Sequence, residues 1–99
     1  MEIDKELSDE FDYVVGFVVA KHYKKEGLIA KQRLLWKLTK EWNGRNMQIG
    51  IPRMVREQLG EEKATELFQD TAEKIMNDPK LLERAIKDRN ELVNGIFGE

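Results

Sequence analysis

The spacing of apolar residues in the first quarter of the chain predicts a helix that is buried on more than one side. Phe11, Val15 and Val18 fall on one helical face, and Phe17 and Ala20 fall on another. A helix that is apolar over so much of its circumference must be covered by several neighbours. We therefore expect this helix to be the central element of the fold.

Polar residues on either side set the limits of this helix. Ser8 and the acidic residues that follow it suit an N-terminus, and two lysines before Gly27 suit a C-terminus. The β-branched run at residues 14–19 also fits a buried strand. The two capping signals lie about 18 residues apart, which is too long for one strand and typical of a helix. Gly16, inside the helix, allows a neighbour to approach closely.

The same periodicity predicts four more helices joined by short connections. The second runs over residues 29–42, and the third begins near Pro52 and ends at Gly60. The fourth opens at Glu61, and the fifth follows an Asp78 N-cap. Between the second and third helices, apolar and polar residues alternate over positions 47–51, so one short extended segment is expected there.

The composition agrees with a single small domain. The chain has 99 residues, which is enough to bury one core. Of these residues 40% are hydrophobic and 36% charged, and the hydrophobic fraction is too high for general disorder. Five helices with short connections are typical of an all-α bundle. We therefore predict one all-α helical domain over residues 1–99.

Three absences indicate a cytoplasmic protein that does not enter the membrane. The sequence has no cysteine, which suits a reducing compartment. The N-terminus is acidic, whereas a secretory signal begins with positive charge. The longest apolar run, residues 13–20, is far shorter than the roughly 20 residues that span a bilayer.

Charge is distributed very unevenly along the chain. Residues 21–56 contain ten Lys or Arg and two Asp or Glu, a net charge of +8. The segments before and after, 1–20 and 57–99, each carry a net charge of −5. Such a basic segment indicates a polyanionic or acidic partner, which we take to be a nucleic acid or an acidic protein surface.

On the second helix the basic residues are interleaved with a tryptophan, a pattern that suits phosphates and stacked bases. The loop and helix that follow supply three more arginines, and the third helix offers its N-terminus to an anion. The predicted nucleic-acid-binding residues are Lys31, Arg33, Trp36, Lys37, Lys40, Arg45, Arg53 and Arg56.

Other interpretations of these residues stay open. A lysine-rich face is often merely solvated or paired with acidic neighbours, and Trp36 lies at the edge of the apolar stripe, where it also suits the core. The third and fourth helices resemble a helix-turn-helix in spacing, but the fourth is acidic and phosphates would repel it. A DNA-binding element is therefore expected on the second or third helix.

No residue pattern indicates catalysis, a cofactor or a metal site. His22 is the one histidine, and with Glu26 it supplies too few ligands for a metal, so we expect it at the rim of the core. The carboxylates fall at helix starts or on polar faces, where they stay ionised. We therefore predict a protein that is not an enzyme.

The alternative function is a protein–protein module, either a self-associating adaptor or a small inhibitor. Three methionines, at positions 47, 54 and 76, are of the type that lines adaptable binding surfaces. The last helix also carries a large apolar face, and a monomer of this size is not expected to cover all of it. That face comprises Leu82, Leu92, Val93, Ile96 and Phe97.

Overall fold

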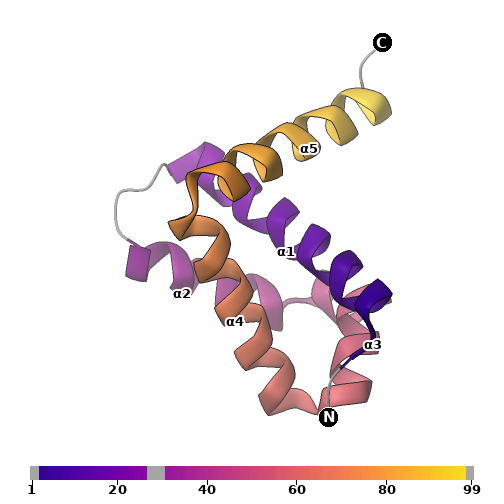
Figure 1. Ribbon diagram of the computed structural model, residues 1–99. Helices are drawn as coiled ribbons and strands as arrows, with labels where there is room; N and C mark the ends of the chain where they lie inside the picture. The colour runs from indigo at the N-terminus through magenta and orange to yellow at the C-terminus, as the bar shows by residue number, and fades with distance from the viewer. Residues whose placement is uncertain (1–2, 27–30, 98–99) are drawn as a thin grey trace.

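The computed structural model describes residues 3–26 and 31–97, and these form helices and short turns without any β-strand. The all-α prediction is therefore confirmed. The elements, shown in Figure 1, are α1 (Lys5–Glu26), α2 (Lys31–Asn43), the 3₁₀ helix η1 (Arg45–Gln48), α3 (Gly50–Leu59), α4 (Glu61–Asn77) and α5 (Pro79–Phe97).

Helix α1 is the central element, as its apolar pattern predicts. It contacts each of the other four α-helices, and its buried side chains extend from Leu7 to Ala20. The Cα radius of gyration of 13.2 Å is close to the roughly 13 Å expected of a compact domain of this length. No helix among the described residues is long and apolar enough to cross a membrane.

One predicted boundary differs from the structure, and another lies outside the described residues. Helix α1 begins at Lys5, one turn before Ser8, because Asp4 caps it: Asp4 Oδ1 accepts a hydrogen bond of 2.8 Å from the backbone N–H of Leu7. The N-terminus predicted for α2, at Ile29, lies outside the described residues, and the described helix begins at Lys31.

The extended segment expected near residues 47–51 is replaced by the 3₁₀ turn of η1. Ile49 alone has extended backbone, with φ −126° and ψ 164°, and α3 starts at Gly50, whose φ is +67°. The physical reason is burial of Met47 in the core, which the turn of η1 allows. The predicted cap of α5 is confirmed, since Asp78 Oδ1 accepts the N–H of Lys80 at 2.9 Å.

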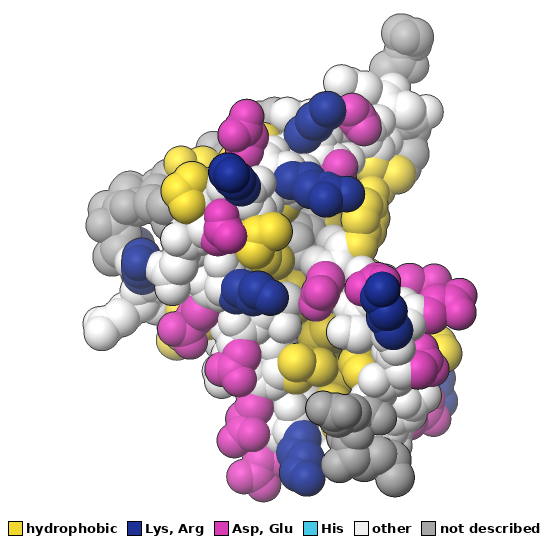
Figure 2. Space-filling view, viewed as in Figure 1, with side chains coloured by type: hydrophobic (Ala, Val, Ile, Leu, Met, Phe, Trp, Pro, Cys, Tyr) yellow, Lys and Arg dark blue, Asp and Glu magenta, His cyan; other side chains and the backbone are white. Residues whose placement is uncertain are grey.

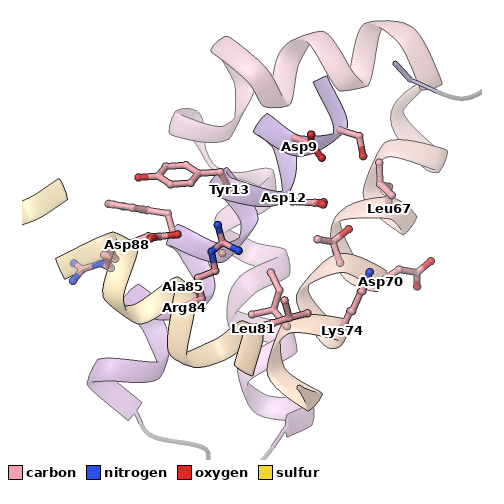
Figure 3. A pocket seen from close by; sticks show the side chains of 16 residues that line it. Asp9, Asp12, Tyr13, Leu67, Asp70, Lys74, Leu81, Arg84, Ala85 and Asp88 are labelled. Atoms are coloured by element: carbon pink, nitrogen blue, oxygen red, sulfur yellow. The ribbon is translucent and has the colours of Figure 1, made fainter. Parts of the chain in front are cut away.

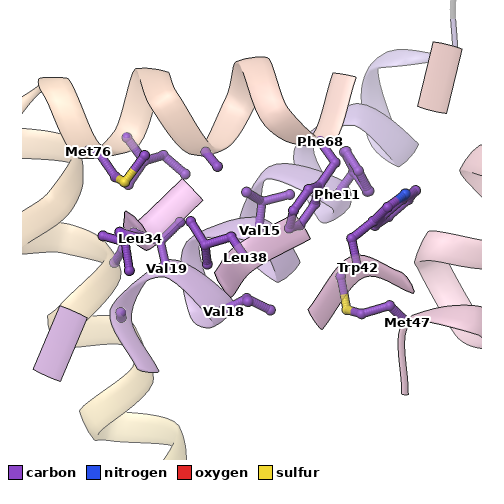
Figure 4. Close-up of a cluster of buried hydrophobic side chains, with 14 of the residues drawn as sticks. Phe11, Val15, Val18, Val19, Leu34, Leu38, Trp42, Met47, Phe68 and Met76 are labelled. Atoms are coloured by element: carbon purple, nitrogen blue, oxygen red, sulfur yellow. The ribbon is translucent and has the colours of Figure 1, made fainter. Parts of the chain in front are cut away.

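Trp42 lies at the centre of the aromatic part of the core, which Figure 4 shows from close by. Its ring stacks on Phe68 of α4 at 4.8 Å and meets the edge of Phe11 of α1 at 5.8 Å. Its indole Nε1 donates a hydrogen bond of 2.8 Å to Thr65 Oγ1. Three helices therefore meet on one side chain, and its single polar atom is satisfied.

Arg56 of α3 packs over the ring of this tryptophan. Its Cζ lies 3.7 Å from the centre of the Trp42 ring, and the residue is only 9% exposed. Nη2 donates to the carbonyl of Trp42 at 2.9 Å, Nη1 to the carbonyl of Met47 at 2.6 Å, and Nε to Glu61 Oε2 at 3.0 Å. The guanidinium thus joins α2, η1, α3 and α4.

Helices α1 and α5 cross where both carry small residues. A Cβ atom added to Gly16 would lie 3.3 Å from Cβ of Ala85, so the predicted close approach at Gly16 is confirmed. Beyond the crossing the two helices diverge, and the C-terminal half of α5 extends away from the other helices (Figure 1). Leu92 is consequently 39% exposed.

Replacing Arg56 by Ala is expected to lower the free energy of unfolding by about 2–4 kcal/mol, because two buried carbonyls lose their donor. Urea denaturation followed by circular dichroism measures the change. Arg53→Ala is the matched control, since that side chain on the same helix is 65% exposed. It is expected to change stability by less than about 0.5 kcal/mol. Equal effects of the two substitutions would contradict the role assigned to Arg56.

Candidate functional site

The residues predicted to bind a polyanion lie on three elements. Helix α2 carries five of them, η1 carries Arg45, and α3 carries Arg53 and Arg56. Four of the five on α2 recur at positions i, i+3, i+4 and i+7 and so share one face of the helix. These four are Arg33, Trp36, Lys37 and Lys40.

The structure brings three of these four side chains beside Arg45. Together they line a shallow, open hollow of about 470 Å³ at the junction of α2 and η1. Gly44 makes the junction tight, because its N–H donates to the Glu41 carbonyl at 2.9 Å and the chain turns directly into η1. We call Arg33, Trp36, Lys37, Lys40 and Arg45 the basic face.

Glu41 is the one carboxylate among the described residues that line the hollow, and two side chains from α1 meet it. Its Oε1 lies 3.2 Å from His22 Nε2 and 3.6 Å from Lys21 Nζ. His22 therefore sits at the rim of the core, as predicted, with a partner on α2. Because Lys21 offsets the charge of Glu41, the cations of the basic face determine the sign of the local potential.

Trp36 is exposed and does not belong to the core. The residue is 60% exposed, and Lys40 Nζ lies 4.7 Å from the centre of its ring. Leu34 and Leu38 form the buried side of the same helix. A large aromatic ring held in solvent beside cations is chemically suited to stacking on another planar group.

The other three predicted residues lie elsewhere. Lys31 bonds to the side-chain oxygen of Asn77 at the end of α4. Arg53 is exposed on α3 and lies 4.0 Å from Glu57, one turn along the helix. Arg56 is buried, and its donors face protein acceptors, so it cannot reach an external phosphate without unfolding. We therefore leave Arg56 out of the proposed interface.

The expectation of a methionine-lined binding surface is contradicted by burial. Met47 and Met76 lie in the core while Met54 is exposed, so the three methionines do not form a common binding surface. Among the residues that the structure describes, no cluster of three or more His, Asp or Glu side chains is placed to hold a metal ion.

A larger groove of about 730 Å³ lies between α1, α4 and α5 (Figure 3). Its apolar lining comes from all three helices and includes Phe17, Leu67, Ile75 and Leu81. Figure 2 shows hydrophobic side chains in the hollow beneath α5, with acidic and basic side chains around them. No sequence pattern indicated this groove, because residues from three separate helices form it.

One carboxylate in the groove has a shifted pKa. Burial raises the pKa of Asp12 above its ordinary value of 3.8. Lys74 opposes this rise in pKa and Asp9 adds to it. Lys74 and Asp9 both line the same groove.

No protein-family model, no curated protein and no solved structure matches this chain.

The raised pKa of Asp12 predicts a stability that depends on pH. The folded chain holds the Asp12 proton more tightly than the unfolded chain, so this group lowers the free energy of unfolding as pH rises from 3.8 through the raised pKa. Asp12→Asn removes the partly desolvated charge and is expected to raise the melting temperature at neutral pH. The gain should vanish below pH 3.8, where the carboxyl is protonated in both states.

Thermal denaturation followed by circular dichroism across this pH range tests the prediction. Glu10→Gln, on an exposed position of the same helix, controls for the loss of one negative charge. A lower melting temperature for Asp12→Asn at neutral pH would show that the carboxylate stabilises the fold instead.

Proposed function

We propose that this protein is a non-catalytic binding module whose basic face contacts nucleic acid. The observation that carries the proposal is the meeting of Trp36, Lys37, Lys40 and Arg45 around one hollow. Cations attract the phosphate backbone, and an exposed indole adds a stacking surface for a base.

The arrangement favours single-stranded nucleic acid over a regular duplex. In a duplex the bases are stacked on one another, so an exposed tryptophan finds no free base face. Along a single strand, Trp36 can stack on a base while Lys40 and Arg45 meet the flanking phosphates. The hollow is also shallow and open, which suits a flexible strand laid across it.

Acidic residues on α4 favour one orientation of the protein on a nucleic-acid strand. Helix α4 exposes Glu62, Glu66, Asp70 and Glu73. Acidic side chains line the outer edge of this helix in Figure 2. Phosphates would be repelled by α4 and attracted by the basic face of α2, so the strand is expected to approach from the α2 side.

The double substitution Lys37→Ala/Lys40→Ala is expected to weaken binding to single-stranded DNA and RNA of any sequence. Loss of two phosphate contacts should flatten the slope of log K against log salt by about 1.4. Fluorescence anisotropy at several salt concentrations measures both effects. Lys63→Ala/Lys87→Ala, which removes two exposed lysines from α4 and α5, is the control with equal charge change. Similar behaviour of the two double variants would reject the basic face as the contact surface.

Trp36→Ala is expected to lower the affinity for a single strand by about 1–3 kcal/mol without changing the salt slope, because it removes stacking and no charge. Binding should also quench tryptophan fluorescence, and Trp36 is the reporter because Trp42 is 0% exposed. Tyr13→Ala removes an exposed aromatic residue from another surface and is expected to leave binding unchanged. Wild-type affinity in Trp36→Ala would exclude stacking on this ring.

A further inference from the structure

Among the described residues that line the hollow of the basic face, His22 alone is of a type whose charge changes near neutral pH. It lines the hollow together with Trp36, Lys40 and Arg45. Imidazole is the side chain that ordinarily gains or loses its charge between about pH 5 and about pH 8. Lysine and arginine ordinarily keep their charge over that interval, and glutamate largely does. The charge of the hollow therefore depends on pH through one side chain.

The contacts of His22 determine which ring nitrogen takes the proton. Its Nε2 lies 3.2 Å from Glu41 Oε1, and an ionised carboxylate can only accept a hydrogen bond. Nε2 therefore carries the hydrogen in the neutral ring, and Nδ1 is the basic atom. No hydrogen bond joins Nδ1 to another described residue. The ring can therefore be protonated at Nδ1 while its contact with α2 stays in place.

Protonation of His22 changes the charge of the hollow by a large fraction. The lining residues include three cations and one carboxylate, which give a net charge of +2 when the ring is neutral and +3 when it is protonated. One further cation from α1 lies beside the carboxylate, at 3.6 Å. The charged groups at this junction are Lys21 from α1, Lys37, Lys40 and Glu41 from α2, and Arg45 from η1.

We propose that His22 makes the binding of single-stranded nucleic acid tighter as pH falls, an inference that rests on the proposed function of the basic face. The neutral ring donates to Glu41 without adding charge. The protonated ring keeps that hydrogen bond and adds a positive charge, which raises the potential that attracts phosphates. The regulation acts on the charge of the hollow and leaves its shape unchanged.

Fluorescence anisotropy with a labelled thymidine oligonucleotide tests the proposal, because neither thymine nor the phosphodiester ordinarily titrates in this interval. The strand has about ten nucleotides, and binding is measured at about pH 8 and about pH 5. The affinity of the wild type is expected to be at least about threefold higher at the lower pH in dilute salt. The slope of log K against log salt should steepen by up to about 0.7, since one more phosphate charge is neutralised.

Two substitutions fix the charge at this position. His22→Gln keeps an N–H that can donate to Glu41 but cannot be protonated, so its affinity should not depend on pH. His22→Lys is charged at both pH values and should bind more tightly than the wild type at the higher pH. Asp12, whose pKa is raised, is the same in both variants, so the comparison isolates position 22. Circular dichroism at both pH values first establishes that each variant keeps its helical content.

Proton NMR gives a second readout that does not depend on affinity. The chain has one histidine, so the signal of its imidazole Cε1–H is identified without ambiguity. Protonation and binding are linked equilibria, so saturation with the oligonucleotide must move the titration of this signal to higher pH. An unchanged titration overturns the proposal.

The anisotropy results separate this inference from the proposed function. Equal pH dependence in the wild type and in His22→Gln overturns the role of His22. Wild-type binding that does not change with pH also rejects that role and leaves the proposed function standing. Absence of binding at both pH values rejects the proposed function, and this inference with it.

Discussion

A buried guanidinium needs an acceptor for each of its donors, and in this protein that requirement fixes how the first and second halves of the chain meet. Helix α2 ends at Asn43, so the carbonyl of Trp42 belongs to its last turn and has no partner within the helix. Arg56 supplies that partner and also binds the carbonyl of Met47 in η1. The cation lies at the negative end of the α2 dipole, which adds to the stabilisation.

The proposed interface depends on this interior contact. Arg45 approaches Lys40 because η1 folds back against the end of α2, and Arg56 holds η1 in that position through the Met47 carbonyl. The buried Arg56 thus positions the exposed Arg45. The exposed cations could be varied with little effect on stability, whereas the buried one could not.

Much of the fold followed from periodicity, because helical faces are local properties of the sequence. The pattern predicted the five helices, the central position of α1 and the close approach at Gly16. The prediction that Arg56 lies on the binding surface followed from its positive charge and disregarded its position on the helix. Arg56 follows Pro52 by four residues and precedes Leu59 by three, so the helical pattern alone puts it on the buried side of α3.

The two concave surfaces were less accessible to sequence reasoning, for a different reason. The basic segment predicted the cations and Trp36. The pairing of Glu41 with Lys21 and His22 was not predicted, because it joins two different helices, α2 and α1. The groove depends on the angle at which α5 crosses α1, and no local pattern encodes that angle. The raised pKa of Asp12 likewise arises from burial by neighbouring helices, and Lys74, far along the chain, opposes the rise.

The contact between Gly16 and Ala85 also limits how this protein can evolve. The two positions share one small volume, since even a methyl group at Gly16 would press on Ala85. A larger residue at either position tilts α5 away from α1 and changes the width of the groove. Among descendants of this sequence, substitutions at these two sites should therefore be correlated, with the sum of the two side-chain volumes preserved.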